Sequence, residues 1–132
     1  MIRAFVDTSA WYAFADSRTS SHARIKSLLS SSKSGLVTSD DVFDETVTLL
    51  RSRHGFEPAR RIGVALRQGL LARVEPVHHA DREEAWALFC RRSDQRLSLT
   101  DCTSFMLMRR MGLEIAISLD EDFRSLGVRT LP

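Results

Sequence analysis

The stretch Ile2-Arg-Ala-Phe-Val-Asp-Thr-Ser9 holds the first strand signal of the chain. Its apolar part, residues 2–6, predicts a β-strand, and the polar tripeptide Asp7-Thr-Ser9 ends that strand. A helical pattern follows at once, over residues 9–15. A strand that leads directly into a helix is how a βαβ unit begins, and this indicates a parallel sheet.

The same alternation continues to the end of the chain. Strands are expected over residues 2–6, 36–38, 73–77, 114–119 and 127–130, with helices between them over residues 9–15, 20–31, 39–53, 58 onward, 80–92, 100–111 and 120 onward. Strands separated by helices of this length imply right-handed crossovers and a sheet covered on both faces. We therefore expect an α/β fold, a three-layer α/β/α sandwich around a mainly parallel five-stranded sheet.

Length and composition fit one ordinary domain, residues 1–132. The chain is 43% hydrophobic and 27% charged, which excludes a disordered or collagen-like protein. No apolar run approaches the ~18 residues of a transmembrane helix, so no membrane partner is expected. The first residues also lack the apolar stretch of a signal peptide, and the cytoplasm is the expected location.

The charge balance hides a strong preference for arginine. Of the 19 basic residues all but Lys26 and Lys33 are Arg, against 17 acidic residues. Arg forms bidentate pairs with phosphate, so this preference fits a protein that binds phosphates or nucleic acid. A GC-rich genome produces the same bias, and both explanations stay open. Cys90 and Cys102 have no metal-ligand spacing and are expected to be reduced thiols.

Four acidic residues are predicted near one edge of the sheet. Asp7 follows the first strand and Asp120 the fourth, Asp101 begins a helix, and Glu45 lies in the second turn of the helix after the second strand. Taken singly, such acids are often helix caps. Taken together they indicate a shared site, because ligands of open parallel sheets bind beyond the carboxyl ends of the strands.

The chemistry of such a site follows from its carboxylates. Carboxylates that lie close together repel, so some are protonated unless a cation joins them. Oxygen ligands without a neighbouring His or Cys favour Mg²⁺ or Mn²⁺ over Zn²⁺. An ion of this kind supports phosphoester cleavage, because it activates water and neutralises charge that develops on the phosphate.

Helical periodicity favours Glu45 over its neighbour Asp44 as the fourth acid. Glu45 shares a helical stripe with Val42 and Leu49 and so borders buried surface. Asp44 lies on a more solvated side of the same predicted helix. This pattern indicates Glu45 without proving its role.

A resemblance to a known family rests on four segments: Phe5-Val-Asp-Thr-Ser-Ala10, Thr38-Ser-Asp-Asp-Val-Phe-Asp-Glu45, Ser98-Leu-Thr-Asp-Cys-Thr-Ser104 and Ser118-Leu-Asp-Glu-Asp-Phe123. In this order, over nearly the whole chain, they resemble PIN domains, and most closely the VapC toxins of toxin–antitoxin pairs. The resemblance implies a PIN-like sheet and a Mg²⁺- or Mn²⁺-dependent endoribonuclease that hydrolyses RNA phosphodiester bonds, the toxin of a type II system.

The resemblance also implies roles for the four acids. Asp7 and Asp101 correspond to the family's metal ligands, and Asp120 completes or supports the metal shell. Glu45 either ligates the metal or holds the attacking water. Removing these four carboxylates from a net charge of +2 leaves the rest of the chain at +6, so the modest net charge does not argue against an RNA substrate.

Hydroxyl groups next to the acids are expected to orient them. By resemblance these are Thr8, Ser9 and Ser118, whose alternative role is in ordinary turns and caps. The family often has His two residues after the position of Asp120, and here that residue is Asp122. A fifth acid either adds metal affinity or lies exposed on the first turn of a helix, and the exposed position is favoured.

Two protein partners are implied by the resemblance, a cognate antitoxin whose C-terminal segment covers the acidic groove and a second copy of the toxin, which gives a homodimer. Five aromatic residues could form a sticky surface, but their helical spacing favours a place in the core: Trp11, Tyr12, Phe14, Trp86 and Phe89.

Other functions remain as alternatives. One is a PIN-like module that binds RNA or protein without catalysis, and another is a housekeeping RNA-processing nuclease. A haloacid-dehalogenase phosphatase is disfavoured because it needs a second Asp two residues after the first, where this chain has Ser9. This phosphatase and a receiver domain both also need a Lys late in the chain, and no Lys follows Lys33. No Gly-rich loop follows the first strand, which excludes a dinucleotide-binding domain.

Overall fold

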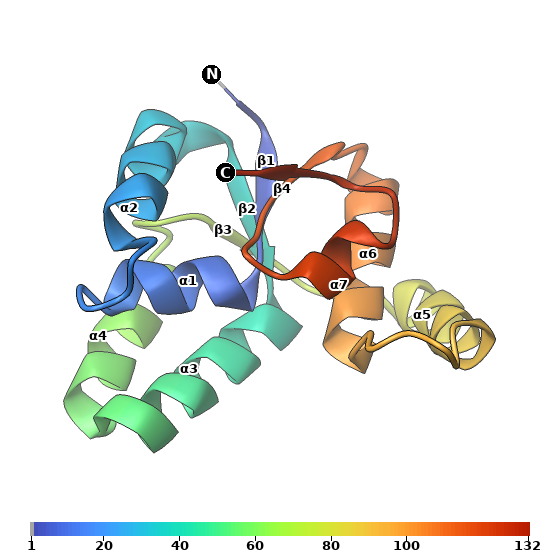
Figure 1. Cartoon of the computed structure of the whole chain (residues 1–132), viewed down its shortest axis with the longest axis horizontal. Coiled ribbons are helices and arrows are strands. Elements are labelled where there is room, and N and C mark those ends of the chain that lie inside the picture. Colours follow the sequence, from blue (N-terminus) through green and yellow to red (C-terminus); the bar gives the residue numbers. More distant parts are fainter. Residues whose placement is uncertain (1) are drawn as a thin grey trace.

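The computed structural model describes residues 2–132 and shows a sheet between two layers of helices (Figure 1). The elements in chain order are β1 (Ala4–Val6), α1 (Thr8–Ala15), α2 (His22–Ser31), a 3₁₀ helix (Lys33–Gly35), β2 (Leu36–Ser39), α3 (Asp40–His54), α4 (Phe56–Arg67), β3 (Arg73–Glu75), α5 (His79–Arg91), α6 (Leu99–Met111), β4 (Ile115–Ile117), α7 (Glu121–Arg124) and β5 (Arg129–Leu131). Within this part of the chain, no helix is long and apolar enough to cross a membrane.

The five strands lie in the order β3-β2-β1-β4-β5, and every neighbouring pair is parallel. Helices α1 to α4 lie on one side of the sheet and α5 to α7 on the other (Figure 1). This confirms the predicted α/β/α sandwich, with a sheet that is parallel throughout. The strand order reverses between β1 and β4, the place where parallel sheets of this kind bind their ligands.

The core forms around the central strand β1. Phe5 and Val6 are fully buried because helices cover both faces of the strand, and Trp11 and Phe123 pack there as well. The Trp11 indole Nε1 donates to Thr38 Oγ1 at 3.3 Å, and that hydroxyl donates to the carbonyl of Val6 at 2.8 Å. These hydrogen bonds fix α1 and β2 against the carboxyl end of β1.

Strand β3 is shorter than predicted, and the reason is local. It ends at Glu75, two residues early, because Pro76 has no N–H to donate to a neighbouring strand. The next N–H, that of Val77, donates to Asp40 Oδ1 at 3.0 Å instead. The chain therefore leaves the sheet here and turns into α5.

Candidate metal centre

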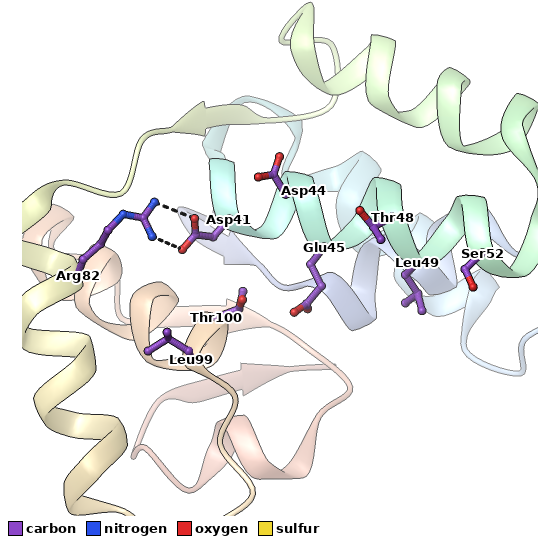
Figure 2. A pocket seen from close by; sticks show the side chains of 9 residues that line it. All are labelled: Asp41, Asp44, Glu45, Thr48, Leu49, Ser52, Arg82, Leu99 and Thr100. Atoms are coloured by element: carbon purple, nitrogen blue, oxygen red, sulfur yellow. Dashed lines mark hydrogen bonds and ion pairs between the residues drawn. The ribbon is translucent and has the colours of Figure 1, made fainter.

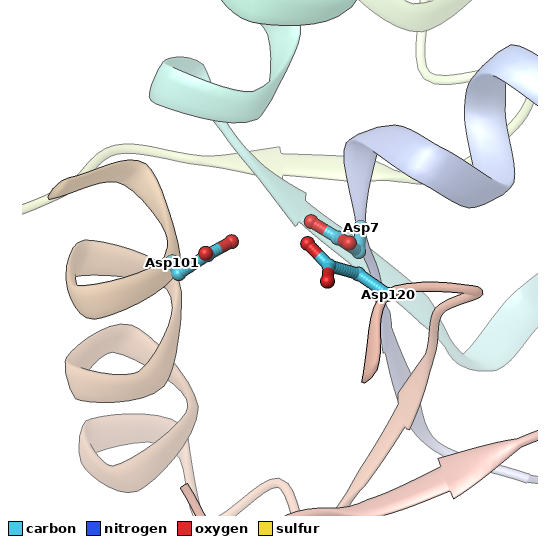
Figure 3. A group of neighbouring side chains, drawn as sticks. All are labelled: Asp7, Asp101 and Asp120. Carbon is cyan, nitrogen blue, oxygen red and sulfur yellow. The ribbon is translucent and has the colours of Figure 1, made fainter. Parts of the chain in front are cut away.

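Three of the four predicted acids meet at the carboxyl edge of the sheet (Figure 3). Asp7 directly follows β1, Asp120 follows the adjacent strand β4, and Asp101 reaches them from the first turn of α6. One carboxylate oxygen of each residue lies within 4.8 Å of those of the other two. We call Asp7, Asp101 and Asp120 the carboxylate triad.

The carboxylate of Asp7 is held by two hydroxyl groups. Its Oδ2 accepts hydrogen bonds from Ser118 Oγ at 2.9 Å and from Ser9 Oγ at 3.0 Å. Ser9 Oγ in turn accepts from the Leu119 backbone N–H at 2.9 Å, which links the end of β4 to α1. By contrast, the buried Thr8 Oγ1 has no hydrogen-bond partner within residues 2–132, so only two of the three predicted hydroxyls contact the triad.

Asp101 and Asp120 each use one carboxylate oxygen as a helix cap. Asp101 Oδ2 accepts from the Ser98 N–H at 3.0 Å, and Ser98 Oγ accepts from the Asp101 N–H at 3.0 Å, a capping box. Asp120 Oδ1 accepts from the Asp122 N–H at 2.9 Å. Capping and clustering therefore coexist: the caps fix the orientation of both carboxylates. The Asp122 carboxylate itself is not part of the triad.

The fourth predicted acid, Glu45, lies outside the triad. It is exposed on α3 and lines a pocket of about 660 Å³ between α3 and the first turns of α5 and α6 (Figure 2). Asp44 and Thr100 line the same pocket, and Thr100 directly precedes Asp101. Glu45 therefore shares a pocket with the residue before Asp101 but not with the triad itself, and its role at the metal stays a prediction.

One ion pair at this pocket was not predicted from the sequence. Arg82 Nη1 and Nη2 donate to the two carboxylate oxygens of Asp41 at 3.0 and 2.9 Å (Figure 2). The hydroxyl of Thr103 also donates to Asp41 Oδ2, at 2.9 Å. These bonds join α3, α5 and α6 at one end of the pocket. No sequence signal links Asp41 to Arg82, because the two residues lie 41 positions apart.

Burial makes the triad electrostatically strained. It raises the pKa of Asp7, although hydrogen bonds from Ser118 and Ser9 work in the opposite direction. Burial also raises the pKa of Asp101 to about 7, and the charges of Asp7 and Asp120 add to this effect. A divalent cation among the three carboxylates would offset both causes, because it stabilises their ionised forms.

The donors of the triad fit a hard divalent cation. They are carboxylate oxygens only, and no His or Cys belongs to the cluster. In Asp101 and in Asp120 the capping hydrogen bond occupies one carboxylate oxygen, and within residues 2–132 the other oxygen accepts no hydrogen bond. Oxygen donors that converge in this way are typical of Mg²⁺ and Mn²⁺ sites rather than of Zn²⁺ sites.

The family of the protein follows from comparison with known domains. A model of the PIN domain matches residues 4–128, nearly the whole chain. The chain belongs to the PIN-domain family. This confirms the resemblance expected from the four sequence segments, and PIN nucleases generally use a divalent metal.

Two relatives show where this PIN domain belongs within the family. Over 123 residues the chain is 37% identical to the 23S rRNA-specific endonuclease VapC20 of Mycobacterium tuberculosis, covering 93% of each protein. The crystal structure of that protein, a sarcin–ricin loop cleaving toxin, superposes with a TM-score of 0.88 and 35% identity over 94% of this chain and 95% of the other. PAE2754 from Pyrobaculum aerophilum, with a TM-score of 0.66 and 16% identity over 98% and 89% of the two chains, shares the fold.

Proposed function

We propose that this protein is a VapC-type toxin, a metal-dependent endoribonuclease that cleaves the sarcin–ricin loop of 23S rRNA. The observation that carries the proposal is its similarity to VapC20 over 93% of both proteins. The carboxylate triad at the switch point of the sheet supplies the chemistry that such an enzyme needs. Residues 1–132 would form one nuclease domain.

In this proposal each residue of the site has a separate task. Asp7, Asp101 and Asp120 hold Mg²⁺ or Mn²⁺. The bound cation supplies Lewis-acid polarisation of the scissile phosphate and of water. Ser9 and Ser118 keep the Asp7 carboxylate in its orientation through the hydrogen bonds described above.

Two further acids would support the reaction from the rim of the site. Glu45, on α3, would either orient the attacking water or add a metal ligand. Asp122 contributes its backbone N–H to Asp120, and this contact supports the orientation of the Asp120 carboxylate.

A non-catalytic binding module is a weaker explanation of this site. Burial and mutual repulsion raise the pKa of Asp101 to about 7, so the ionised triad destabilises the metal-free fold. A module that only grips RNA or protein has no need for this arrangement. A housekeeping nuclease would have the same triad. It differs from a toxin in having no cognate antitoxin.

The partners of the proposed toxin are RNA, a cognate antitoxin that covers the acidic groove, and a second copy in a homodimer. An enzyme that acts on ribosomal RNA works in the cytoplasm. Static light scattering of the isolated protein tests the dimer. Purification together with the product of a neighbouring short reading frame tests the antitoxin, which a housekeeping nuclease would lack.

The substrate is tested by incubating the protein with 23S rRNA in intact ribosomes and, separately, with transfer RNA. We expect one main cut within the sarcin–ricin loop, mapped by primer extension, that requires Mg²⁺ or Mn²⁺ and stops with EDTA. Equal cleavage of transfer RNA, or a main cut elsewhere in 23S rRNA, would contradict the proposed substrate and keep the nuclease assignment.

The contribution of Asp7 and Asp101 to the stability of the metal-free protein is expected to fall as the pH rises. The pKa values of Asp7 and Asp101 are higher in the folded protein than the ~3.9 of an unfolded Asp. At these two residues the folded state binds protons more tightly, so their contribution to stability is fully present below about pH 4 and is lost as the pH rises through the folded pKa of about 7. Asp101→Asn removes one titrating group and makes this slope shallower.

Divalent metal is expected to reverse this loss. At about 100 times its Kd, Mg²⁺ or Mn²⁺ stabilises the fold by about 2.7 kcal/mol, or roughly 10 °C in Tm for a domain of this size. The increase is smaller at pH 5, because protons compete for the same carboxylates. Scanning calorimetry at pH 5 and pH 8 measures both effects, and an unchanged Tm at saturating metal would argue against a shared site.

A further inference from the structure

The three acids of the triad are not attached to the fold in the same way. Asp7 and Asp120 directly follow neighbouring strands, and the Ser118 hydroxyl donates to the Asp7 carboxylate at 2.9 Å while it accepts from the Asp120 N–H at 3.1 Å. Both acids are therefore fixed to the edge of the sheet. Asp101 lies on α6, and its capping box with Ser98 joins it to its own helix. The distance of Asp101 from the other two acids thus depends on where α6 lies.

A hydrogen bond ties the first turn of α6 to the sheet. The Thr103 hydroxyl, two residues after Asp101, donates to Asp41 Oδ2 at 2.9 Å. Asp41 belongs to the first turn of α3, which starts directly after β2. Ser39 at the end of β2 caps that turn, because its Oγ accepts from the Val42 N–H at 3.0 Å. A continuous path therefore runs from β2 through α3 to α6.

Arg82 on α5 fixes the Asp41 carboxylate for this contact. Its Nη1 and Nη2 donate to the two carboxylate oxygens at 3.0 and 2.9 Å (Figure 2). The Thr103 hydroxyl also lies 3.1 Å from the carbonyl of Thr100, but the Asp41 oxygen is nearer and charged, which makes it the stronger acceptor. Thr103 is 2% exposed, so water has little access to its hydroxyl. We call Asp41, Arg82 and Thr103 the α3–α6 clasp.

We propose that the α3–α6 clasp positions Asp101, keeping it within reach of the cation that Asp7 and Asp120 bind. The proposal rests on the proposed metal-dependent function. When ionised, the three carboxylates repel one another, and Asp101 is the one on a separate helix, so the repulsion pushes α6 outward. Packed helices slide by small shifts, and apolar contacts have no preferred direction. The clasp opposes such a shift about 3 Å from Asp101 along the helix, two residues at 1.5 Å each.

The other end of α6 has an attachment of its own. Arg110 lies nine residues after Asp101, about 13 Å along the helix, and it pairs with Asp81 on α5 and Glu75 on β3. Loss of the clasp is therefore expected to shift the first turn of α6 without unfolding the domain. A shift of about 1 Å in a group that takes part in the chemistry can slow a reaction about 100-fold.

Metal binding tests this positioning without any cleavage. Thr103→Val removes the hydroxyl and keeps the shape of the side chain, and isothermal titration calorimetry with Mn²⁺ measures the affinity of the folded protein. We expect binding to weaken about 10- to 100-fold in Thr103→Val and less than about threefold in Thr103→Ser, which keeps the hydroxyl. The Tm of Thr103→Val in EDTA should fall by no more than about 5 °C, because one hydrogen bond is lost.

A second substitution tests whether the effect belongs to the hydrogen bond itself. Asp41→Ala removes the acceptor, and the Arg82 side chain that remains is 47% exposed, so water can solvate it. We expect a similar loss of Mn²⁺ affinity, and no further loss when Thr103→Val is added, because both changes remove the same contact. Glu57→Ala is the matched control: it breaks a two-bond ion pair with Arg60 on α4, at 3.1 and 2.6 Å, and should leave the Mn²⁺ affinity unchanged.

Cleavage kinetics show the same positioning in the reaction. At saturating Mn²⁺ we expect Thr103→Val to lower kcat at least about 10-fold and to change the KM for RNA less than about threefold, because the misplaced group acts on the chemical step. Thr103→Ser should restore kcat.

Two results would overturn the proposal. One is a Mn²⁺ affinity of Thr103→Val and Asp41→Ala equal to that of the unchanged protein. The other is a set of losses that add up in the double variant, which would mean two separate structural effects. Failure of the ribonuclease assignment looks different: the unchanged protein binds Mn²⁺ but cuts no RNA, and the affinities still decide the role of the clasp. An unchanged protein that binds no Mn²⁺ would contradict both the metal centre and the clasp.

Discussion

Asp7→Asn is expected to reduce RNA cleavage at least about 1000-fold while the fold stays intact. Asp7 is buried, and of the three triad residues it is the one whose carboxylate accepts hydrogen bonds from two hydroxyl groups. The amide removes the negative charge that holds the cation. Loss of metal-ion catalysis costs several kcal/mol of barrier, which corresponds to a factor of about 1000 or more in rate.

The same variant is expected to gain stability when metal is absent. Burial raises the pKa of Asp7, so its ionised form is unfavourable in the folded protein near pH 7, and the neutral amide of similar shape removes this cost. Calorimetry in EDTA should therefore give a Tm equal to or above that of the unchanged protein. Cleavage should therefore fall while Tm stays equal or rises, and this combination distinguishes loss of catalysis from loss of folding.

A matched control is available in Asp94, an exposed acid in the loop between α5 and α6. Asp94→Asn changes the net charge by the same amount and should leave cleavage and metal response unchanged. If Asp7→Asn cleaved RNA as fast as Asp94→Asn, the triad would not be the catalytic centre.

The parts of this molecule that sequence alone predicts are those governed by local signals. Asp7 and Asp120 each follow their own strand, and parallel strands bring their carboxyl ends to one edge, so the pairing of these acids follows from the alternation of strands and helices. Asp101 is also predictable from a local signal, because its capping box marks the start of a helix. Because these signals are local, the PIN-like fold could be predicted from the sequence, and the structure confirms it.

The parts that sequence could not predict depend on contacts between distant segments. Asp41 and Arg82 pair across 41 positions, and with 17 Arg residues in the chain no pattern selects the right partner. Helical spacing is the same for a covered and an open face, so the exposure of Trp86 was decided by how α5 packs on α6. Periodicity likewise placed Glu45 at the border of buried surface but could not give its distance from the triad.

A second large effect is expected at Arg110, far from the metal centre. Arg110 Nε donates to Asp81 Oδ2 at 2.9 Å, and its Nη2 donates to the carbonyl of Pro76 at 3.0 Å. Its Nη1 also lies 3.5 Å from Glu75 Oε1. Asp81 is 3% and Glu75 8% exposed, so the Arg110 guanidinium on α6 pairs with two buried carboxylates from β3 and α5, of which Glu75 also pairs with Arg73 at 2.8 Å.

Arg110→Ala is expected to lower the free energy of unfolding by about 3 kcal/mol, the lower end of the range for breaking a buried ion pair, because Arg110 itself is partly exposed. That loss corresponds to roughly 10 °C in Tm for a domain of this size.

Arg109→Ala is the matched control. Arg109 is exposed on the same helix and lies over the Phe105 ring, 6.0 Å from its centroid, a contact of about 0.5–1 kcal/mol. Urea unfolding compares the two variants, and equal midpoints would show that Asp81 and Glu75 do not depend on Arg110. Cleavage by Arg110→Ala well below its Tm should stay unchanged, because none of its partners belongs to the triad.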